Sequence, residues 1–168
     1  MNADAPHTAA LATLAATPAL LRSLLAALPP DVTGVAADGA WSPKDVVAHL
    51  LLAERNGAIA RIRTIVANDD PLLQNRDEDD ELAQSGARAQ PLANLLAEFA
   101  QLREEDVTWL RTLDDHTLLR GGRHSAVGRV TAGEFLCHAA YHDCLHLAQL
   151  ATMLQSHFEP HRGHMRAF

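Results

Sequence analysis

The chain has 168 residues, with 14 Lys and Arg against 21 Asp and Glu, which gives a formal net charge of −7. Ala and Leu dominate its apolar residues, and the low content of β-branched and aromatic residues favours an all-α fold. An acidic chain without clustered Lys and Arg argues against nucleic acid as a partner, because contacts to a phosphate backbone need those cations. The length suits one domain, so residues 1–168 are expected to fold as a single unit.

The sequence shows no pattern for export, membrane insertion or a disulfide bond. Its first residues lack the positive charge of a signal peptide, and Pro18 and Arg22 interrupt the apolar stretch that follows. On a helix, Cys137 and Cys144 would lie about 10.5 Å apart along the axis, which is too far for a disulfide bond. We therefore expect a reduced, cytoplasmic protein without a membrane partner, in which both cysteines pack inside the fold.

The first predicted helix spans residues 8–28, and its apolar stripe consists of Leu20, Leu21, Leu24, Leu25 and Leu28. Proline is favoured in the first turn of a helix and kinks a helix when it lies inside one. Both situations fit Pro18, and we expect the helix to start near Thr17, after a shorter helical turn around Leu11. Pro29 ends the helix. The loop that follows contains the turn residues Asp31, Gly34, Asp38 and Gly39.

The second predicted helix starts at a strong capping signal. Ser42 can cap the helix, Pro43 suits its first position, and Asp45 completes a capping box. An apolar stripe continues to about Val66, so a single helix is expected from Pro43 to this residue. His49 lies beside the core-facing edge of the stripe, where an imidazole needs a partner for each ring nitrogen.

A polar, acidic connection at residues 68–90 is expected next, with one helical turn around Leu82. A connection of this length is uncommon in compact domains and is often functional or mobile. The third predicted helix spans residues 91–114 and carries an apolar stripe of leucines. Two charged sites are expected at the surface of these helices, Glu54 on the second and residues 103–106 on the third.

Residues 116–130 contain three glycines and no helical period, which predicts an extended hairpin. Thr131 and Glu134 form a second capping box, which opens a fourth helix that ends near Gln155. Four amphipathic helices with one long middle connection predict an antiparallel four-helix bundle.

The most informative segment is residues 138–150, which read H-A-A-Y-H-D-C-L-H-L-A-Q-L. His138, His142 and His146 recur every fourth residue and would share one stripe of a helix. Neighbours in this stripe are offset by about 6 Å along the axis, so two imidazoles can reach one metal ion, whereas the outer pair are about 12 Å apart. The spacing predicts a site with two histidines from this helix and a third ligand from elsewhere, although ordinary core or surface histidines also show it.

Three segments, taken in order, resemble the DinB/YfiT-like family. They are W-S-P-K-D-V-V-A-H-L at residues 41–50, R-G-G-R-H-S-A-V-G-R-V-T at residues 120–131, and the histidine segment above. The resemblance implies a four-helix, up-down-down-up bundle with a divalent metal ion held by three histidines. Matched residue by residue, the implied ligands are His49, His142 and His146.

Two ligands one turn apart and a third from another helix would leave coordination positions open, which is typical of a catalytic site. Imidazole suits several metals, and we expect Zn or Ni, with Fe or Mn as alternatives. The resemblance also implies two activities on small-molecule substrates. One is the transfer of a low-molecular-weight thiol (bacillithiol, mycothiol or glutathione) to an electrophile, and the other is metal-dependent hydrolysis. We place thiol transfer first because no residue stands out as a general base.

Further residues are candidates for the surroundings of the ligands or for a substrate pocket. His138 could contact the ligands or a substrate, although a hydrogen-bonded helix histidine is the more common situation. His124 could overhang the ion or lie in solvent, and Trp41 could wall the cleft or pack on the core. Gln149 adds a polar group to the histidine stripe. Asp143 is expected to pack against or cap a neighbouring segment.

A second class of function needs no catalysis. In this hypothesis the chain is a homodimeric bundle that binds a metal or a ligand and acts in a stress response. The long acidic connection and the polar helix faces would then contact a partner. An enzyme would lose its activity when the metal is removed, whereas such a binding protein would keep its function.

Overall fold

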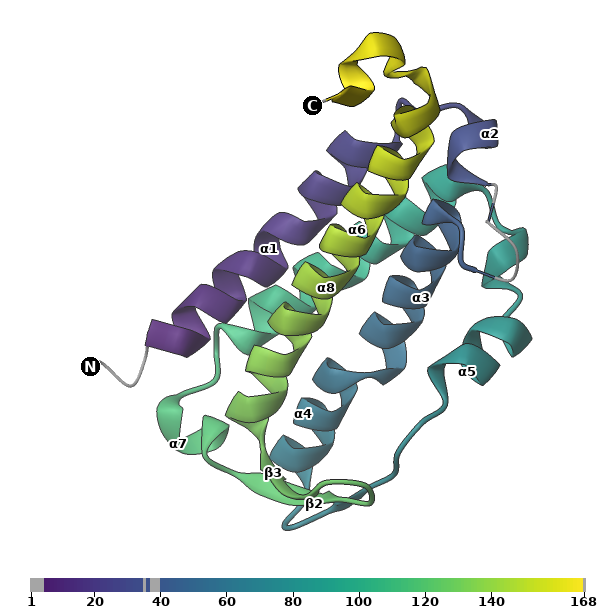
Figure 1. The fold of residues 1–168 in the computed structure, drawn as a ribbon. Helices are drawn as coiled ribbons and strands as arrows, with labels where there is room; N and C mark the ends of the chain where they lie inside the picture. The colour runs from purple at the N-terminus through teal and green to yellow at the C-terminus, as the bar shows by residue number, and fades with distance from the viewer. Residues whose placement is uncertain (1–4, 35, 37–39, 168) are drawn as a thin grey trace.

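The computed structural model describes residues 5–34, 36 and 40–167, and its four long helices form a bundle (Figure 1). These helices are α1 (Ala5–Leu25), the divided helix α3–α4 (Pro43–Asn56 and Ala58–Ala67), α6 (Leu92–Leu110) and α8 (Ala132–Phe158). α1 and α3–α4 lie at opposite corners, because each packs mainly against α6 and α8. In chain order the helices run up, down, down and up, which confirms the predicted all-α four-helix bundle. Two expected turn residues, Asp38 and Gly39, lie outside the described residues.

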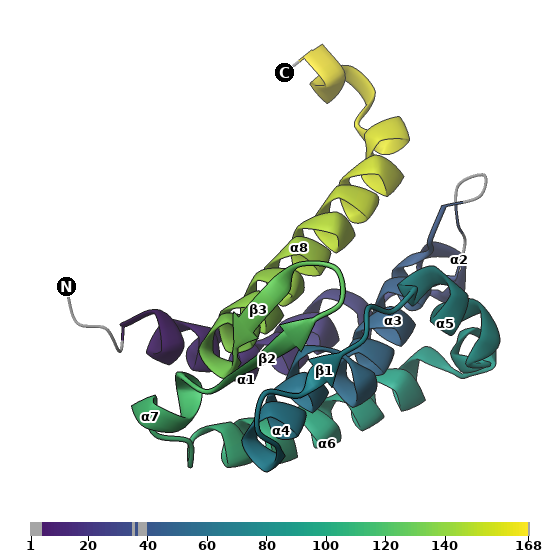
Figure 2. The same ribbon diagram turned by 90° about the horizontal axis from the view of Figure 1, so that it is seen from below.

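Short elements connect the long helices. The helical ones are α2 (Pro30–Thr33), α5 (Glu78–Gln84), α7 (Asp115–Leu118), η1 (Ala87–Ala89), η2 (Glu159–His161) and η3 (Gly163–Ala167). The strands are β1 (Leu72–Leu73), β2 (Gly121–His124) and β3 (Gly128–Thr131). β2 and β3 form the predicted hairpin, and β1 pairs in parallel with β2. This small sheet lies at the end of the bundle where α4 ends and α8 begins (Figure 2).

α1 is one continuous helix through Pro18, so the predicted start near Thr17 is wrong. Because proline has no N–H, the carbonyl of Leu14, four residues earlier, lacks its usual helical donor. The guanidinium of Arg103 on α6 donates to this carbonyl from Nη1 at 3.1 Å. A contact from another helix therefore compensates for the proline, and a pattern within α1 could not have revealed it.

α1 is also the single helix among the described residues that could span a membrane by its length and composition. The leucines on its inner face, Leu14, Leu21 and Leu25, are fully buried in the bundle core. A core helix of a soluble protein and a signal sequence pass the same test of length and composition.

The predicted second helix is divided at Gly57. Its capping box forms as predicted, because the N–H of Asp45 donates to Oγ of Ser42 at 3.2 Å and the N–H of Ser42 donates back to Oδ2 at 2.9 Å. Gly57 has φ −90° and ψ −130°, outside the helical range, and a Cβ at this position would lie 2.4 Å from the carbonyl oxygen of Ala53. The prediction of one unbroken helix to Val66 is therefore wrong.

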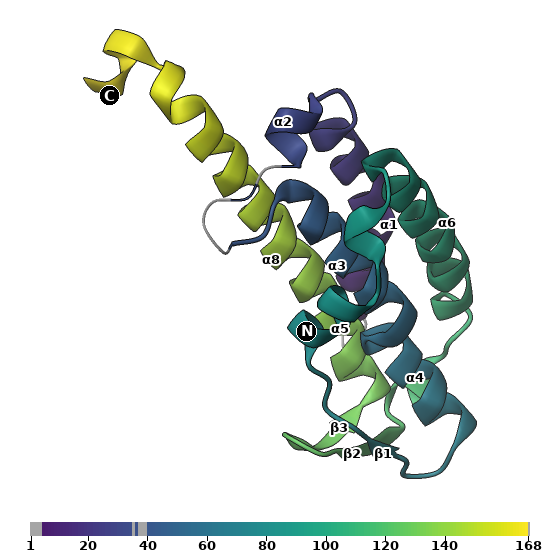
Figure 3. The ribbon, with the colours of Figure 1, turned by 90° about the vertical axis from the view of Figure 1, so that its right-hand side faces the viewer.

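The connection from α4 to α6 runs the length of the bundle, because α3–α4 and α6 point in the same direction. It contains β1, α5 and η1, so it has more regular structure than predicted. Leu82 is buried, and α5 packs against α3 on the outside of the bundle (Figure 3). Asp77 caps α5 by accepting from the N–H of Asp80 at 3.1 Å, and Glu81 pairs with Arg76. Part of the acidic run thus holds α5 in place.

Two hydrophobic clusters form the core, one on each side of a charged layer. The first joins the start of α1 to α4 and the start of α8, and the second joins the end of α1 to α3 and the start of α6. Along α8, the buried apolar residues of the first cluster end at Ala140, and the second cluster continues with the partly buried Leu147 and the buried Leu150. The charged layer, which consists of Glu54, Arg103 and Asp143, lies between the two clusters.

Candidate metal centre

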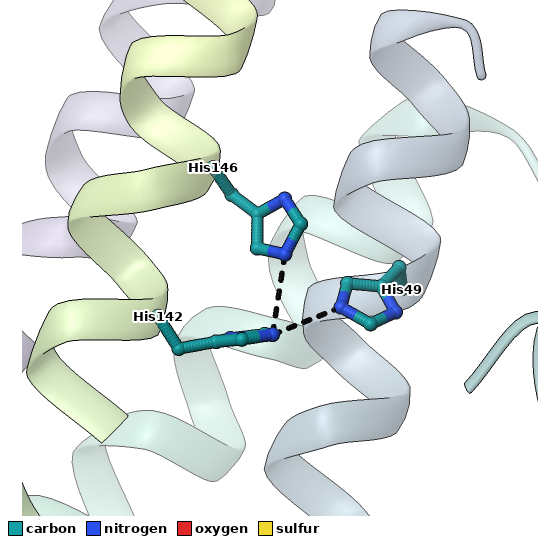
Figure 4. Close-up of side chains that lie close together, drawn as sticks. All are labelled: His49, His142 and His146. Atoms are coloured by element: carbon teal, nitrogen blue, oxygen red, sulfur yellow. Dashed lines mark hydrogen bonds between the residues drawn. The ribbon is translucent and has the colours of Figure 1, made fainter. Parts of the chain in front are cut away.

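Three histidine rings meet between α3 and α8 (Figure 4). His49 comes from α3, and His142 and His146 lie one turn apart on α8. Nε2 of His142 lies 3.0 Å from Nε2 of His49 and 3.2 Å from Nε2 of His146. One nitrogen from each ring lies within 4.8 Å of the other two. The structure thus brings together two of the three histidines of the helical stripe and His49, which is the set that the resemblance implied.

Local structure orients these rings. The capping box at Ser42 starts α3 so that His49, which is only 2% exposed, faces α8 from the second turn. On α8, Nδ1–H of His146 donates to Oε1 of Gln149 at 2.8 Å. This bond leaves Nε2 of His146 as an acceptor that faces the other two rings. Gln149, which sequence analysis placed on the histidine stripe, therefore fixes the direction of one ring.

The three nitrogens fit a cation better than a network of hydrogen bonds. Burial, followed by the charges of His146 and His142, lowers the pKa of His49 to about 3. Burial and then His146 lower the pKa of His142 to about 4. A neutral His142 can donate from Nε2 to one neighbour only, so the contact with the other neighbour has no hydrogen. Imidazoles at about 2.1 Å from one Zn ion would have their nitrogens about 3.4 Å apart, so the donor set fits a divalent metal ion.

Two side chains from outside the helix pair complete the surroundings of the three histidines. Trp41, just before α3, lies 4.7 Å from the ring of His49 and 6.1 Å from that of His146, between ring centroids. It lies beside the site and also packs against the second hydrophobic cluster, so it has both roles that the sequence left open. Glu78, the first residue of α5, places Oε2 3.6 Å from Nε2 of His49, with a side chain that is 60% exposed. Nothing in the sequence had distinguished Glu78 from the other acidic residues beside it.

A cavity of about 400 Å³ opens beside His142, and both His138 and His124 line it. The exposed ring of His138 lies 6.4 Å from that of His142, and His124 lies 6.3 Å from the ring of Phe135. Burial and then the charge of Arg61 lower the pKa of His124. Neither His138 nor His124 belongs to the three-histidine cluster. Their places on the cavity wall suit contacts with a substrate.

A family model described as the DinB superfamily matches residues 13–150. The chain belongs to the DinB superfamily. The fold of this superfamily member is similar to that of YfiT from Bacillus subtilis, described as a probable metal-dependent hydrolase with an unusual four-helix bundle topology. The alignment covers 89% of this chain and 87% of YfiT, at 21% identity and a TM-score of 0.73.

A second solved structure, TT2238, is described as a four-helix bundle protein. The alignment covers 87% of this DinB-superfamily chain and 98% of TT2238, at 22% identity and a TM-score of 0.58. At identities this low, the two structures support the fold alone. A comparison with curated proteins finds no match.

The charged layer next to the histidines is the feature that sequence analysis missed. Arg103, which is 3% exposed, donates from Nε and Nη2 to the two carboxylate oxygens of Glu54 at 2.7 and 2.6 Å. It also donates from Nη1 and Nη2 to Asp143 at 2.5 and 3.2 Å, and from Nη1 to the carbonyl of Leu14. These five hydrogen bonds match the five N–H donors of a guanidinium. The layer ties together α1, α3, α6 and α8 immediately behind His142.

The surface positions predicted for Glu54 and Arg103 are therefore wrong. Burial alone would lower the pKa of Arg103, but the hydrogen bonds that it donates to Glu54 and Asp143 outweigh burial and raise this pKa above its ordinary value. The guanidinium thus stays charged. One sequence feature could have indicated the burial: Arg103 lies four residues after Phe99 and four before Val107, so it shares their apolar stripe.

The two cysteines are free, and neither joins the metal centre. Cys137 is half-buried, and burial raises the pKa of its thiol. Cys144 is exposed on the outer face of α8, so its predicted packing inside the fold is wrong. Its neighbours on this face, Tyr141 and Leu145, are also exposed.

Proposed function

We propose that this protein is a metal-dependent enzyme whose divalent ion is held by His49, His142 and His146. The observation that carries the proposal is the convergence of three imidazole nitrogens within 4.8 Å at the edge of a 400 Å³ cavity. Three protein ligands leave coordination positions open for a substrate, as in catalytic rather than structural sites. A divalent ion bound there would acidify a water or thiol ligand and make it nucleophilic at neutral pH.

Zn or Ni is the proposed metal, with Fe or Mn as alternatives. The lowered pKa values of His49 and His142 keep these rings neutral, so their nitrogens are available as ligands at physiological pH. A ligand set made of imidazole alone suits Zn and Ni better than Mn, which prefers oxygen ligands.

Hydrolysis is the reaction that the geometry supports best. The sequence ranked thiol transfer first because it showed no general base, and Glu78 now supplies a carboxylate 3.6 Å from Nε2 of His49. A carboxylate at this place can accept a proton from a nucleophile at the site. The description of YfiT as a probable metal-dependent hydrolase agrees with this choice. Thiol transfer is the second candidate, because the cavity has the volume of a small-molecule site and can hold a thiol beside its electrophile.

The test starts with the bound metal and continues with both reactions. The metal content of the wild type is compared with that of His146→Ala and of a control, His157→Ala, which removes an exposed histidine from the last turn of α8. The same proteins are then assayed with nitrophenyl esters and with chlorodinitrobenzene plus bacillithiol, mycothiol or glutathione. Turnover that requires metal and is lost in His146→Ala supports an enzyme. A wild type that holds no transition metal after reconstitution contradicts the proposal.

A non-catalytic, homodimeric binding protein of a stress response is the candidate from another class. The exposed side chains of Tyr141 and Leu145, four residues apart on the outer face of α8, favour a contact between two copies. A dimer in light scattering that Leu145→Glu dissociates, combined with bound metal and no turnover, would favour this candidate. We place either protein in the cytoplasm, where the two free cysteines would stay reduced.

A further inference from the structure

The cavity beside the histidines has two chemically different ends. His142 lies at one end, and at the other the guanidinium of Arg61 on α4 lies 5.9 Å from the ring centroid of Phe135. Phe135 and His142 are seven residues apart on α8, which offsets their backbone positions by about 10 Å along the helix axis. Apolar side chains, among them Ile59, Val130 and Ala139, make up most of the lining surface, and the carboxylates of Glu78 and Glu134 also line the cavity.

Arg61 differs from the other arginines of this cavity in having no acidic partner. Arg76 pairs with Glu81, and Arg103 is saturated by the charged layer. Among the described residues, no carboxylate lies within ion-pair distance of Arg61, which makes one hydrogen bond, from Nη2 to the carbonyl of Gln74 at 3.0 Å. Most of its N–H donors therefore have no hydrogen-bond partner among the described residues.

The electrostatic surroundings of Arg61 agree with its lack of a partner. Burial, followed by the charge of Arg76, lowers the pKa of Arg61, although Glu78 and Glu81 act in the opposite direction. A half-buried guanidinium in this state gains from an anionic ligand, which supplies the charge and the acceptors that the chain does not.

We propose that the cavity binds a substrate with a carboxylate group, which pairs with Arg61 while an apolar body about 10 Å long reaches toward the histidines. A carboxylate fits because it is planar and singly charged, and it can accept two N–H bonds from one edge of a guanidinium. The inference rests on the proposed function only in its claim that the reacting group lies at the histidine end. The anion site itself does not depend on a metal ion.

The test therefore uses the metal-free full-length protein, in which a carboxylate cannot bind to an ion instead. Calorimetric titration compares 4-phenylbutyrate with 4-phenylbutanol, which has the same apolar body and no charge. We expect Arg61→Gln to weaken the binding of phenylbutyrate about tenfold or more, because a charge-assisted bidentate contact is lost, and to leave phenylbutanol within about twofold. Arg61→Lys, which keeps the charge but not the planar fork, should show an intermediate loss.

The matched control is Arg63→Gln, which removes the same charge from the same helix. Arg63 is 46% exposed and pairs with Asp106 beside Trp109, away from the cavity. Arg63→Gln should leave the binding of phenylbutyrate and phenylbutanol unchanged. Circular dichroism checks that each variant is folded. If Arg61→Gln does not fold, the comparison is made with Arg61→Lys.

Three outcomes would overturn the inference. They are no binding of phenylbutyrate to the wild type, equal effects of Arg61→Gln on the acid and the alcohol, and tighter binding of phenylpropyl phosphate than of phenylbutyrate. His146→Ala separates this inference from the proposed function, because it should lose the metal ion and still bind phenylbutyrate. If His146→Ala keeps its metal ion while Arg61→Gln no longer binds phenylbutyrate, the result contradicts the proposed function and supports the anion site.

Discussion

Two buried polar clusters lie next to each other in this bundle, and they differ in how their hydrogen-bonding capacity is used. In the charged layer, the five donors of Arg103 meet five acceptor contacts from Glu54, Asp143 and Leu14. In the histidine cluster, by contrast, Nε2 of His142 faces two other ring nitrogens and can donate to only one of them. The saturated cluster therefore supports the fold, and the unsaturated one is suited to bind a ligand.

The largest effect is expected from breaking the charged layer. Arg103→Met should lower the free energy of unfolding by about 3–5 kcal/mol, because it leaves two carboxylates buried without a cation. Urea denaturation measures this loss, and the control is Arg111→Met, which removes an exposed arginine at the C-terminal end of α6. A loss below 1 kcal/mol would show that Glu54 and Asp143 find water or other donors.

The next largest effect on stability is expected from binding of the metal ion. A divalent ion at a free concentration 100 times its Kd should raise the free energy of unfolding of the wild type by about 2.7 kcal/mol, because it binds only the folded state. His49→Ala should abolish this gain while changing the stability of the metal-free protein much less than Arg103→Met does. Thermal unfolding with and without metal measures both. Equal stabilisation of the wild type and His49→Ala would mean that the ion binds elsewhere.

The metal-free protein should also lose stability in mild acid. The folded-state pKa values of His49 and His142 are lowered to about 3 and about 4, so between these values and the ordinary pKa of 6.5 the unfolded chain binds more protons than the folded one. Stability therefore falls as the pH drops below 6.5, by on the order of 1 kcal/mol for each histidine between pH 7 and 5.5. Urea titrations at the two pH values measure the loss. The double variant His49→Gln/His142→Gln should remove most of this pH dependence, and an unchanged dependence would assign it to other groups.

The smallest effect is expected at Gln149. Gln149→Leu removes the acceptor for Nδ1–H of His146 and should weaken metal affinity about tenfold, in keeping with other hydrogen-bond partners of metal ligands. Competition with a chromogenic chelator measures the affinity. Gln155→Leu, an exposed glutamine farther along α8, is the control and should have no effect.

These clusters also mark how far the sequence could be interpreted. Local signals predicted the capping boxes at Ser42 and Thr131, because each box is made of residues three apart. Spacing predicted that two of His138, His142 and His146 would bind one ion. The family resemblance alone selected His142 and His146 and added His49, because 93 residues separate His49 from His142. Contacts between residues that are distant in sequence determine which side chains join these clusters, and a local sequence pattern does not contain that information.

The errors have the same origin. Pro18 was expected near the start of a helix because its compensating donor, Arg103, lies on α6. Glu54 and Arg103 were expected at the surface because a charge looks solvent-exposed until its partners are known. Glu78 was one acid among several until α5 placed it beside His49.

The parallel course of α3–α4 and α6 has a further consequence. A bundle whose neighbouring helices alternate in direction needs only short turns. This topology instead requires a strap, residues 68–91, that returns along the outside of α3. The strap delivers Glu78, Arg76 and Asn75 to the cavity without being part of the four-helix framework. Substitutions in this one peripheral segment can therefore change the side chains that line the cavity beside the histidines, while the helices that carry the metal ligands stay unchanged.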